Sequence, residues 1–211
     1  MKLLIINLLL IFYSAFSAIA QNMDEVFIRM PDEFVTQLEN AWRKDLLDLY
    51  KSDKTATLDN TMQGKSTLLK LTDKYLLLQS TERTTIELRL LPLINNTHVM
   101  CMITTVYAPV ADSHVRFYTT DWQQLPTADL FTAATIERFL RTDADTVSVA
   151  YIDAKTSLDM CLVKYSLSPD SNDLTAEFTT PQYLDADAAK KVKVIINDMP
   201  LKFQWKSGRF E

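Results

Sequence analysis

The side chains best suited to nucleophilic or metal chemistry are scarce in this chain of 211 residues. There are two cysteines, Cys101 and Cys161, and two histidines, His98 and His114. A thiolate beside an imidazole can act as a nucleophile, but neither cysteine is flanked by a sequence typical of a catalytic loop. Neither histidine has a second ligand type at metal spacing. We therefore predict no catalytic residue and no metal site.

Glycine usage argues against several cofactor classes. The chain contains only Gly64 and Gly208, whereas average usage would give about fourteen. Phosphate-binding loops, dinucleotide fingerprints and the nucleophile elbow of hydrolases each need closely spaced glycines. The sequence therefore predicts that the protein uses no cofactor.

The two cysteines leave two alternatives open. Both lie in strand-like apolar runs, Cys101 in residues 99–103 and Cys161 in residues 160–163. If these strands are neighbours, a disulfide would close a loop of about 60 residues and stabilise the fold by roughly 4 kcal/mol. The flanking aliphatic side chains favour the other alternative, in which both are buried free thiols that pack as small hydrophobic groups.

Paired carboxylates are the remaining candidates for acid–base chemistry. They occur at Asp32 with Glu33, Asp143 with Asp145, and Asp185 with Asp187. All six fall in predicted loops or at predicted helix starts, where carboxylates commonly cap helices and stabilise turns. A hydrolase that uses loop carboxylates is therefore an alternative rather than the main hypothesis.

The segment from Pro109 to Trp122 is the strongest candidate for a binding site, because it has the densest aromatic side chains. Successive residues of a strand point to opposite faces of a sheet, so one ring should be exposed if only one face is covered. An exposed ring would form a platform for a sugar or a peptide. If helices cover both faces, the rings instead belong to the core. The candidate binding residues are Asp112, His114, Phe117, Tyr118 and Trp122.

An amphipathic helix is predicted before these residues, from Pro31 to about Lys51, after a short extended lead over residues 26–28. Its apolar side chains recur every three or four residues. They are Phe34, Leu38, Ala41, Trp42, Leu46, Leu49 and Tyr50. We expect this face to pack on a sheet and to bury Phe34 and Trp42.

From Thr55 to Asp121 the hydrophobic period changes to two, which is typical of strands. Hairpin-length loops separate the predicted strands, so consecutive strands should pair antiparallel as a meander. The strands span residues 66–72, 75–80, 84–92, 98–108 and 113–120. In the third of these, Glu87 and Arg89 alternate with apolar residues, which predicts that both charged side chains face water.

The second half repeats the order of elements, a helix followed by strands, without residue-level similarity to the first half. We predict a helix over residues 132–141, strands over 146–153, 158–168 and 173–180, a helix over 185–199 and a strand over 201–205. Asp185 is a good N-cap for the last helix and Pro200 ends it. The helix should bury Ala189, Val192, Ile195, Ile196 and Met199. The predicted fold is one α+β domain over residues 21–211, an antiparallel β-meander sheet packed with an N-terminal helix and a C-terminal helix.

The first twenty residues are typical of a secretory signal peptide. Lys2 precedes an apolar run that closes on Ala18-Ile19-Ala20, and no second long apolar stretch follows. We predict cleavage near Ala20, a periplasmic or secreted protein, and no membrane span. Position 21 is Gln rather than the Cys that lipid attachment requires. After residue 20 the chain carries 21 Lys and Arg against 27 Asp and Glu, which disfavours nucleic acid as a partner.

Several stretches resemble a known family. They are residues 45–50 (DLLDLY), 71–78 (LTDKYLLL), 90–93 (LLPL), 110–122 (VADSHVRFYTTDW) and 205–210 (WKSGRF). On these stretches the chain is similar to the domain-of-unknown-function family 3256, secreted proteins of anaerobic gut-type Gram-negative bacteria. The resemblance implies a place in the bacterial envelope and carries no assigned activity or site residue.

Three classes of function remain. A non-catalytic binding or accessory module of the envelope fits the absence of catalytic and cofactor motifs, and its partner would be an envelope protein, a peptide or a glycan. An envelope protein inhibitor or partner-regulating domain is a specialised alternative that would expose a large apolar patch. The hydrolase is the enzyme alternative, and it requires carboxylates that converge in a pocket.

Overall fold

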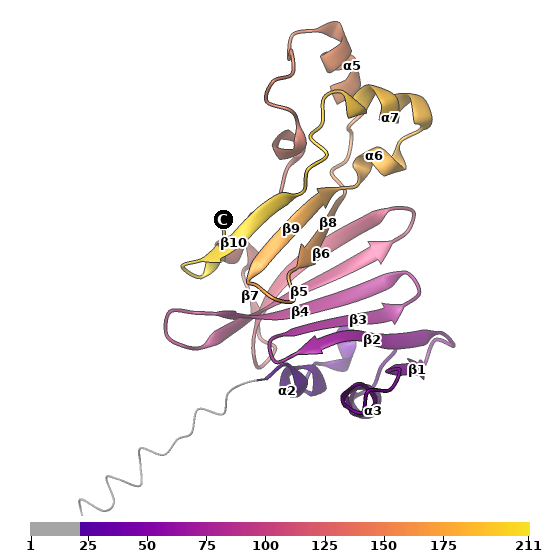
Figure 1. Ribbon diagram of the computed structural model, residues 1–211, viewed down its shortest axis with the longest axis vertical. Coiled ribbons are helices and arrows are strands. Elements are labelled where there is room, and N and C mark those ends of the chain that lie inside the picture. Colours follow the sequence, from indigo (N-terminus) through magenta and orange to yellow (C-terminus); the bar gives the residue numbers. More distant parts are fainter. Residues whose placement is uncertain (1–21) are drawn as a thin grey trace, which may run out of the picture.

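The N-terminal region consists of short helices separated by tight connections. The computed structural model describes residues 22–211 (Figure 1), so the predicted signal peptide lies outside the described residues. The first elements are helix α2 (Met23–Ile28), the 3-10 turn η1 (Asp32–Phe34) and helix α3 (Asn40–Lys51). The predictions of an extended lead and of one continuous helix from Pro31 are therefore wrong. No helix of the described residues is long and apolar enough to cross a membrane.

Arg43 explains why the predicted helix is interrupted. Its guanidinium is buried and donates hydrogen bonds to the carbonyl oxygens of Leu38 (2.7 Å) and Met30 (2.6 Å) and to Oδ1 of Asp32 (2.8 Å). These acceptors lie in or beside the connections that flank η1, where backbone carbonyls lack helical partners. The chain can therefore turn twice between α2 and α3, which buries Val35.

Seven strands form an antiparallel meander in which each strand pairs with the next in sequence. They are β1 (Thr57–Asp59), β2 (Lys65–Thr72), β3 (Tyr75–Thr81), β4 (Thr84–Pro92), β5 (His98–Tyr107), β6 (Ala111–Thr119) and β7 (Gln124–Leu125). The five predicted strands are confirmed, and their ends differ from the prediction by at most two residues. Strands β1 and β7 are too short to produce a sequence pattern.

Helices α2 and α3 cover one face of the meander (Figure 1, lower part), as predicted for the N-terminal helical segment. Leu46 of α3 is fully buried against side chains such as Leu76 and Leu88 of the sheet. Phe34 and Trp42 are half-buried and pack against the same cluster. Burial of these apolar groups is the main force that holds the helices on the sheet.

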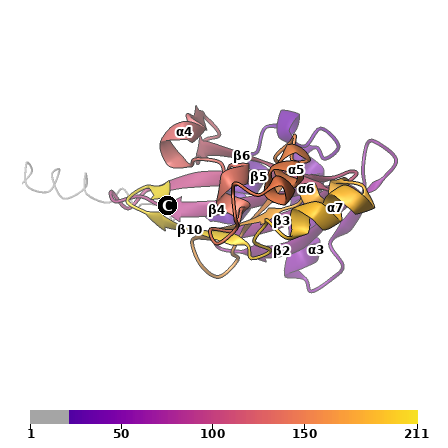
Figure 2. The same cartoon turned by 90° about the horizontal axis from the view of Figure 1, so that it is seen from above.

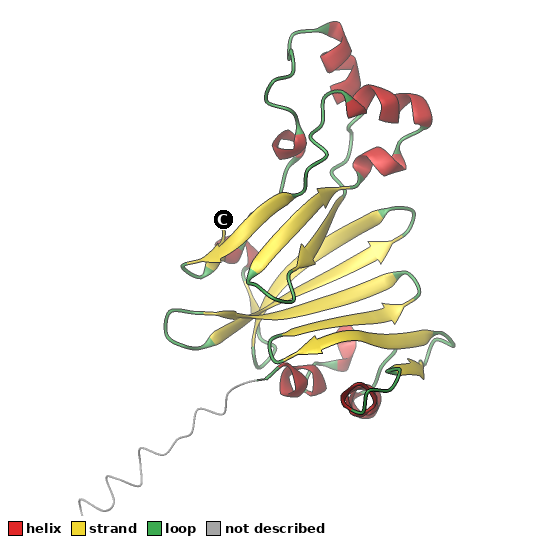
Figure 3. Ribbon diagram, in the orientation of Figure 1, coloured by secondary structure: helices red, strands yellow, loops and turns green. Residues whose placement is uncertain are grey.

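A second sheet of four strands covers the opposite face of the meander (Figure 3). Its strands are β8 (Val163–Leu167), β9 (Asp173–Phe178), β10 (Leu201–Lys206) and β11 (Arg209–Phe210), in the spatial order β11-β10-β9-β8. Glu87 and Arg89 are buried beneath it. The prediction that they face water is wrong, because the strands that cover them lie about 80 residues further along the chain.

The outer edge of β8 is held by side-chain acceptors from the meander. The N–H groups of Val163, Tyr165 and Leu167 donate to Oδ1 of Asp112 (3.1 Å), Oγ of Ser113 (3.0 Å) and Oε2 of Glu87 (2.9 Å), respectively. These three residues alternate along β8, so they are the positions whose N–H groups point away from β9. The two sheets are thus joined by hydrogen bonds as well as by apolar packing.

The remaining helices lie beyond the second sheet, at the top of Figure 1, except for α4 (Thr127–Leu130). We call this part the cap. It runs from η2 (Ile136–Phe139) to α5 (Val149–Thr156), and from α6 (Thr180–Tyr183) through α7 (Ala186–Lys193) to the residues before β10. Viewed from above, α5, α6 and α7 lie together and α4 lies apart from them (Figure 2).

The cap differs most from the sequence prediction. Residues 146–153 were predicted as a strand, but Ser148 caps α5 by accepting the N–H of Tyr151. The predicted helix over residues 132–141 is only the short turn η2. Asp185 caps α7 as predicted, by accepting two backbone N–H groups. However, α7 ends at Lys193 and packs against α5 rather than the meander, and Met199 is 72% exposed.

Candidate functional site

The three rings of the predicted binding segment are all buried. Phe117 lies between the two sheets, with its ring centroid 6.2 Å from that of Trp205. Tyr118 and Trp122 lie on the opposite face, in contact with Phe34 at centroid distances of 5.1 and 5.3 Å. The expectation of an exposed ring is therefore wrong, because helices cover one face of β6 and the second sheet covers the other.

Asp112 and His114 lie at the surface but have different structural roles. Asp112 accepts the Val163 N–H and so helps to hold β8. His114 is exposed at the rim of a hollow of about 310 Å³, which we call the β6 slot. Ser113, Val115 and Tyr165 contribute further walls of the slot from the two sheets. The remaining walls come from α4 and the residues that follow it, namely Thr127, Ala128, Phe131 and Ala133.

The β6 slot lacks an activated proton acceptor or nucleophile. Burial raises the pKa of the Tyr165 phenol, whose oxygen accepts the Ala134 N–H at 2.8 Å. The phenol therefore stays protonated near neutral pH. The slot offers mostly apolar walls with hydroxyl and imidazole groups at the rim, which suits binding better than chemistry.

Both cysteines are free thiols. Cys101 is fully buried between the sheets, and this burial raises its pKa. Cys161 lies in the connection before β8 and is exposed, and burial of part of its side chain also raises its pKa. Thiols with raised pKa values are poor nucleophiles near neutral pH. The free-thiol alternative describes this structure, although Cys161 is not the buried hydrophobic group that the apolar run indicated.

The paired carboxylates are used in structural contacts. Asp32 accepts from Arg43, and Asp143 accepts two hydrogen bonds from the Arg141 guanidinium (3.0 and 2.8 Å). Asp185 caps α7. Within residues 22–211, no three or more His, Cys, Asp or Glu side chains gather to hold a metal ion. Asp185 thus has the capping role expected for it, whereas Asp32 and Asp143 form ion pairs with arginines.

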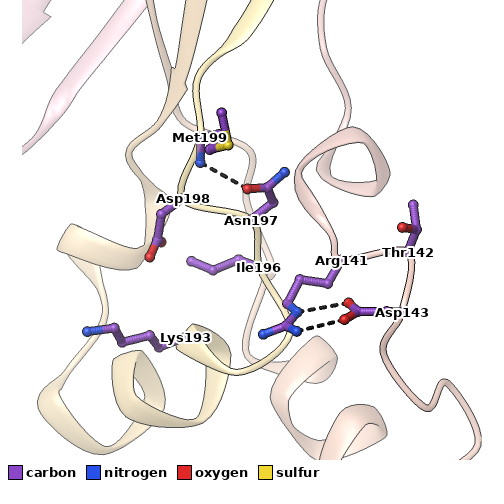
Figure 4. Close-up of a pocket in the computed structure, with 8 residues that line it drawn as sticks. All are labelled: Arg141, Thr142, Asp143, Lys193, Ile196, Asn197, Asp198 and Met199. Atoms are coloured by element: carbon purple, nitrogen blue, oxygen red, sulfur yellow. Dashed lines mark hydrogen bonds and ion pairs between the residues drawn. The ribbon is translucent and has the colours of Figure 1, made fainter.

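A second hollow of about 540 Å³ opens in the cap (Figure 4), and we call it the cap hollow. Its floor forms where residues 139–141 run antiparallel to residues 195–197. The Arg141 N–H donates to the Ile195 carbonyl (2.8 Å), and the Asn197 N–H donates to the Phe139 carbonyl (2.7 Å). The hollow is lined by Arg141, Thr142, Asp143, Lys193, Ile196, Asn197, Asp198 and Met199.

Positive and negative groups are balanced at the cap hollow. Arg141 is held by Asp143, and Figure 4 shows Lys193 and Asp198 on the other side of the hollow. Asn197 accepts the Met199 N–H through Oδ1 (3.1 Å), which fixes the turn that carries the exposed Met199 side chain. The hollow thus has no net charge to attract an ion and sits beside exposed apolar surface.

Exposed apolar side chains are concentrated on the cap. Six of the eleven large apolar side chains that the described residues expose belong to it. They are Val147, Val149, Ile152, Tyr183, Val194 and Met199. The sequence does not reveal this surface, because the alternation around Val147 and Val149 resembles a buried strand.

Taken together, the fold and these surfaces define a two-sheet α+β protein with open hollows and no assembled catalytic group among the described residues. The chain belongs to the family described as "Protein of unknown function (DUF3256)", whose pattern matches residues 15–210. Among solved structures it is similar to a domain of an uncharacterized protein from Porphyromonas gingivalis W83. The two share 29% sequence identity with a TM-score of 0.81, over 90% of this chain and 98% of the other. No curated protein matches the chain.

Proposed function

We propose that this protein is a non-catalytic binding module of the bacterial envelope that holds a protein partner on its cap. The observation that carries the proposal is the concentration of exposed apolar side chains on the cap, one of which, Met199, lines the cap hollow. Exposed apolar surface rimmed by polar groups is typical of protein–protein interaction sites. The leader-like residues 1–20 support a place in the envelope.

The chemistry of the cap favours a protein over a glycan or an ion. A glycan site usually presents flat aromatic rings, whereas five of the six exposed side chains are aliphatic or thioether groups. An ion site would concentrate one sign of charge, whereas Arg141 is paired with Asp143 and Lys191 with Asp153 (2.8 Å). A surface that combines aliphatic side chains with charged groups of both signs is complementary to the surface of another protein.

Site-specific photocrosslinking in the producing bacterium tests this proposal. A photoreactive residue replaces Val149 on the cap, and in a matched strain it replaces Ile94, which is 88% exposed in the β4–β5 hairpin. We expect a discrete protein adduct from position 149 and none from position 94. Adducts of equal yield at both positions, or none at Val149, would contradict the proposal.

The envelope location needs a separate measurement. Mass spectrometry of the protein purified from the envelope fraction should give an N-terminus at or near Gln21. Retention of residues 1–20 in that fraction would contradict an exported mature form.

A further inference from the structure

The β6 slot lies beside the part of β6 that β7 is too short to reach. Strand β7 pairs only with Phe117 and Tyr118 of β6. Pro126 follows directly, and the chain then turns into α4. Among residues 22–211, no strand pairs with this side of residues 113–116.

The unpaired backbone groups of β6 can be assigned from the register. The Thr119 N–H points to this side, because it donates to the Gln123 carbonyl at 2.8 Å. N–H and C=O groups alternate sides along an antiparallel strand, and the β5–β6 ladder has no bulge. The N–H and C=O groups of Val115 and Ser113 therefore point outward, into the place that a longer β7 would occupy.

The slot supplies a side-chain pocket next to these backbone groups. Val115, Phe131 and Tyr165 form its inner wall, and each is more than nine-tenths buried. A residue opposite Val115 on an added strand would point to the same face as Val115 and so toward this wall. The apolar lining would bury an aliphatic or aromatic side chain.

The other face of the same edge carries one cation beside the slot. Arg116 is exposed on β6 and forms no ion pair with the described residues, whereas Asp112, further along the same face, accepts the Val163 N–H. A side chain of an added strand that neighbours Arg116 would gain from being acidic. The edge is thus complementary to an extended segment in which apolar and acidic residues alternate.

We propose that the β6 slot binds an extended peptide segment of alternating apolar and acidic residues, added antiparallel to β6 in line with β7. Backbone hydrogen bonds to Val115 and Ser113 hold the segment, and the pocket and Arg116 select its side chains, as in other strand-addition complexes. This site is separate from the cap, so the inference does not depend on the proposed function of the cap.

The test uses a seven-residue peptide of alternating valine and glutamate with blocked ends, and residues 22–211 as the protein. Two comparison peptides have lysine in place of glutamate, or N-methyl groups on alternate amides. We expect the valine–glutamate peptide to bind and to slow amide hydrogen exchange at Val115 and Ser113, as measured by NMR. Equal binding of the N-methylated peptide, or unchanged exchange at Val115, would overturn the proposal.

Two kinds of variant test the pocket and the charge. Ala133→Trp fills the slot from its exposed wall, and we expect affinity to fall about tenfold or more, as for other blocked side-chain pockets. Ala41→Trp, at an exposed position on α3, is the matched control and should bind like the parent. If Ala133→Trp does not fold, as judged by circular dichroism, Ala128→Trp blocks the same slot.

Arg116→Glu should reverse the preference between the two charged peptides, by about threefold or more from one cross-strand ion pair. An unchanged preference would overturn the assignment of an acidic ligand. Association of two protein copies through β6, with no binding of the peptide, would overturn the proposal as a whole.

Discussion

The meander and the cap differ in how much buried surface holds them. The two faces of the meander contribute to clusters of nineteen and seventeen buried residues, whereas the cluster between α5 and α7 has five. The cap nevertheless exposes more large apolar side chains than the rest of the described chain. Regions with few buried contacts open more easily than the core. The comparison indicates that stability resides mainly in the two sheets and that the cap is the part expected to open first.

Placing a charge beneath the meander should have the largest effect. Leu46→Asp puts a carboxylate among fully buried side chains of α3 and the sheet. We expect the free energy of unfolding to fall by several kcal/mol, measured by urea denaturation. A variant that melts like the parent would show that α3 is not part of the stabilising core.

A loss of buried packing in the cap should destabilise the cap without destabilising the meander. Val192 is fully buried between α7 and α5, and Val192→Ala should cost about 2 kcal/mol of packing there. We expect faster amide exchange in α5 and α7 with little change in β3–β5, measured by hydrogen–deuterium exchange. Equal acceleration in both regions would mean that cap and meander unfold as one unit, which would remove the contrast between them.

The contribution of Glu87 to the free energy of unfolding, through its contacts between the two sheets, should depend on pH. Burial raises the pKa of this carboxyl above its ordinary value, although the Leu167 N–H and Tyr75 O–H hydrogen bonds lower it. The folded protein therefore binds this proton more readily than the unfolded chain. Its contribution to the free energy of unfolding is full below the ordinary carboxyl pKa and is lost as pH rises through the raised pKa.

Glu87→Gln measures this effect directly, because glutamine cannot titrate. We expect the parent to gain stability relative to the variant when the pH is lowered from about 7 to about 5. A difference between the two proteins that does not change with pH would contradict the role given to burial. Urea titrations at the two pH values provide the measurement.

Removing one acceptor from the β8 edge should have a smaller effect. Asp112→Ala leaves the Val163 N–H without its 3.1 Å partner, which should cost about 1 kcal/mol. His114→Ala is the matched control, because His114 is exposed and near Asp112 on the same strand. Thermal denaturation should separate the two variants, and equal melting temperatures would exclude a role for Asp112 in holding β8.

The two thiols should differ in reactivity. Labelling the exposed thiol should hardly change the stability of the fold. Cys161 is exposed and Cys101 is fully buried. We expect one maleimide per folded chain, at Cys161, and a second only after denaturation. Labelling of Cys101 in the folded protein would show that the sheets separate readily.

The meander could be predicted because its signals are local. Alternation in β2–β6 and loops of a few residues fix both the strands and their antiparallel order. The water-facing assignment of Glu87 and Arg89 was wrong because the strands that bury them come much later in the chain. Arg89, for example, donates to the carbonyl oxygens of Ser168 (3.0 Å) and Pro169 (2.8 Å).

The cap and the site were harder to predict for a different reason. The alternation of Val147 and Val149 has the period of a strand, but Ser148 caps a helix and leaves both valines more than 80% exposed. The aromatic platform depended on one open sheet face, a condition set by tertiary packing. The alternative in which both sheet faces are covered and the rings belong to the core is the one that describes Phe117 and Tyr118.

The three acceptors along β8 have a consequence for the order of folding. They come from residues 51 to 80 positions away in the chain, and closing such long loops is slow compared with forming hairpins. We therefore expect the hairpins of the meander to form first and to act as a template on which β8 finds its register. A slip of β8 by one residue would turn its free N–H groups away from all three acceptors, so the template also rejects the wrong register.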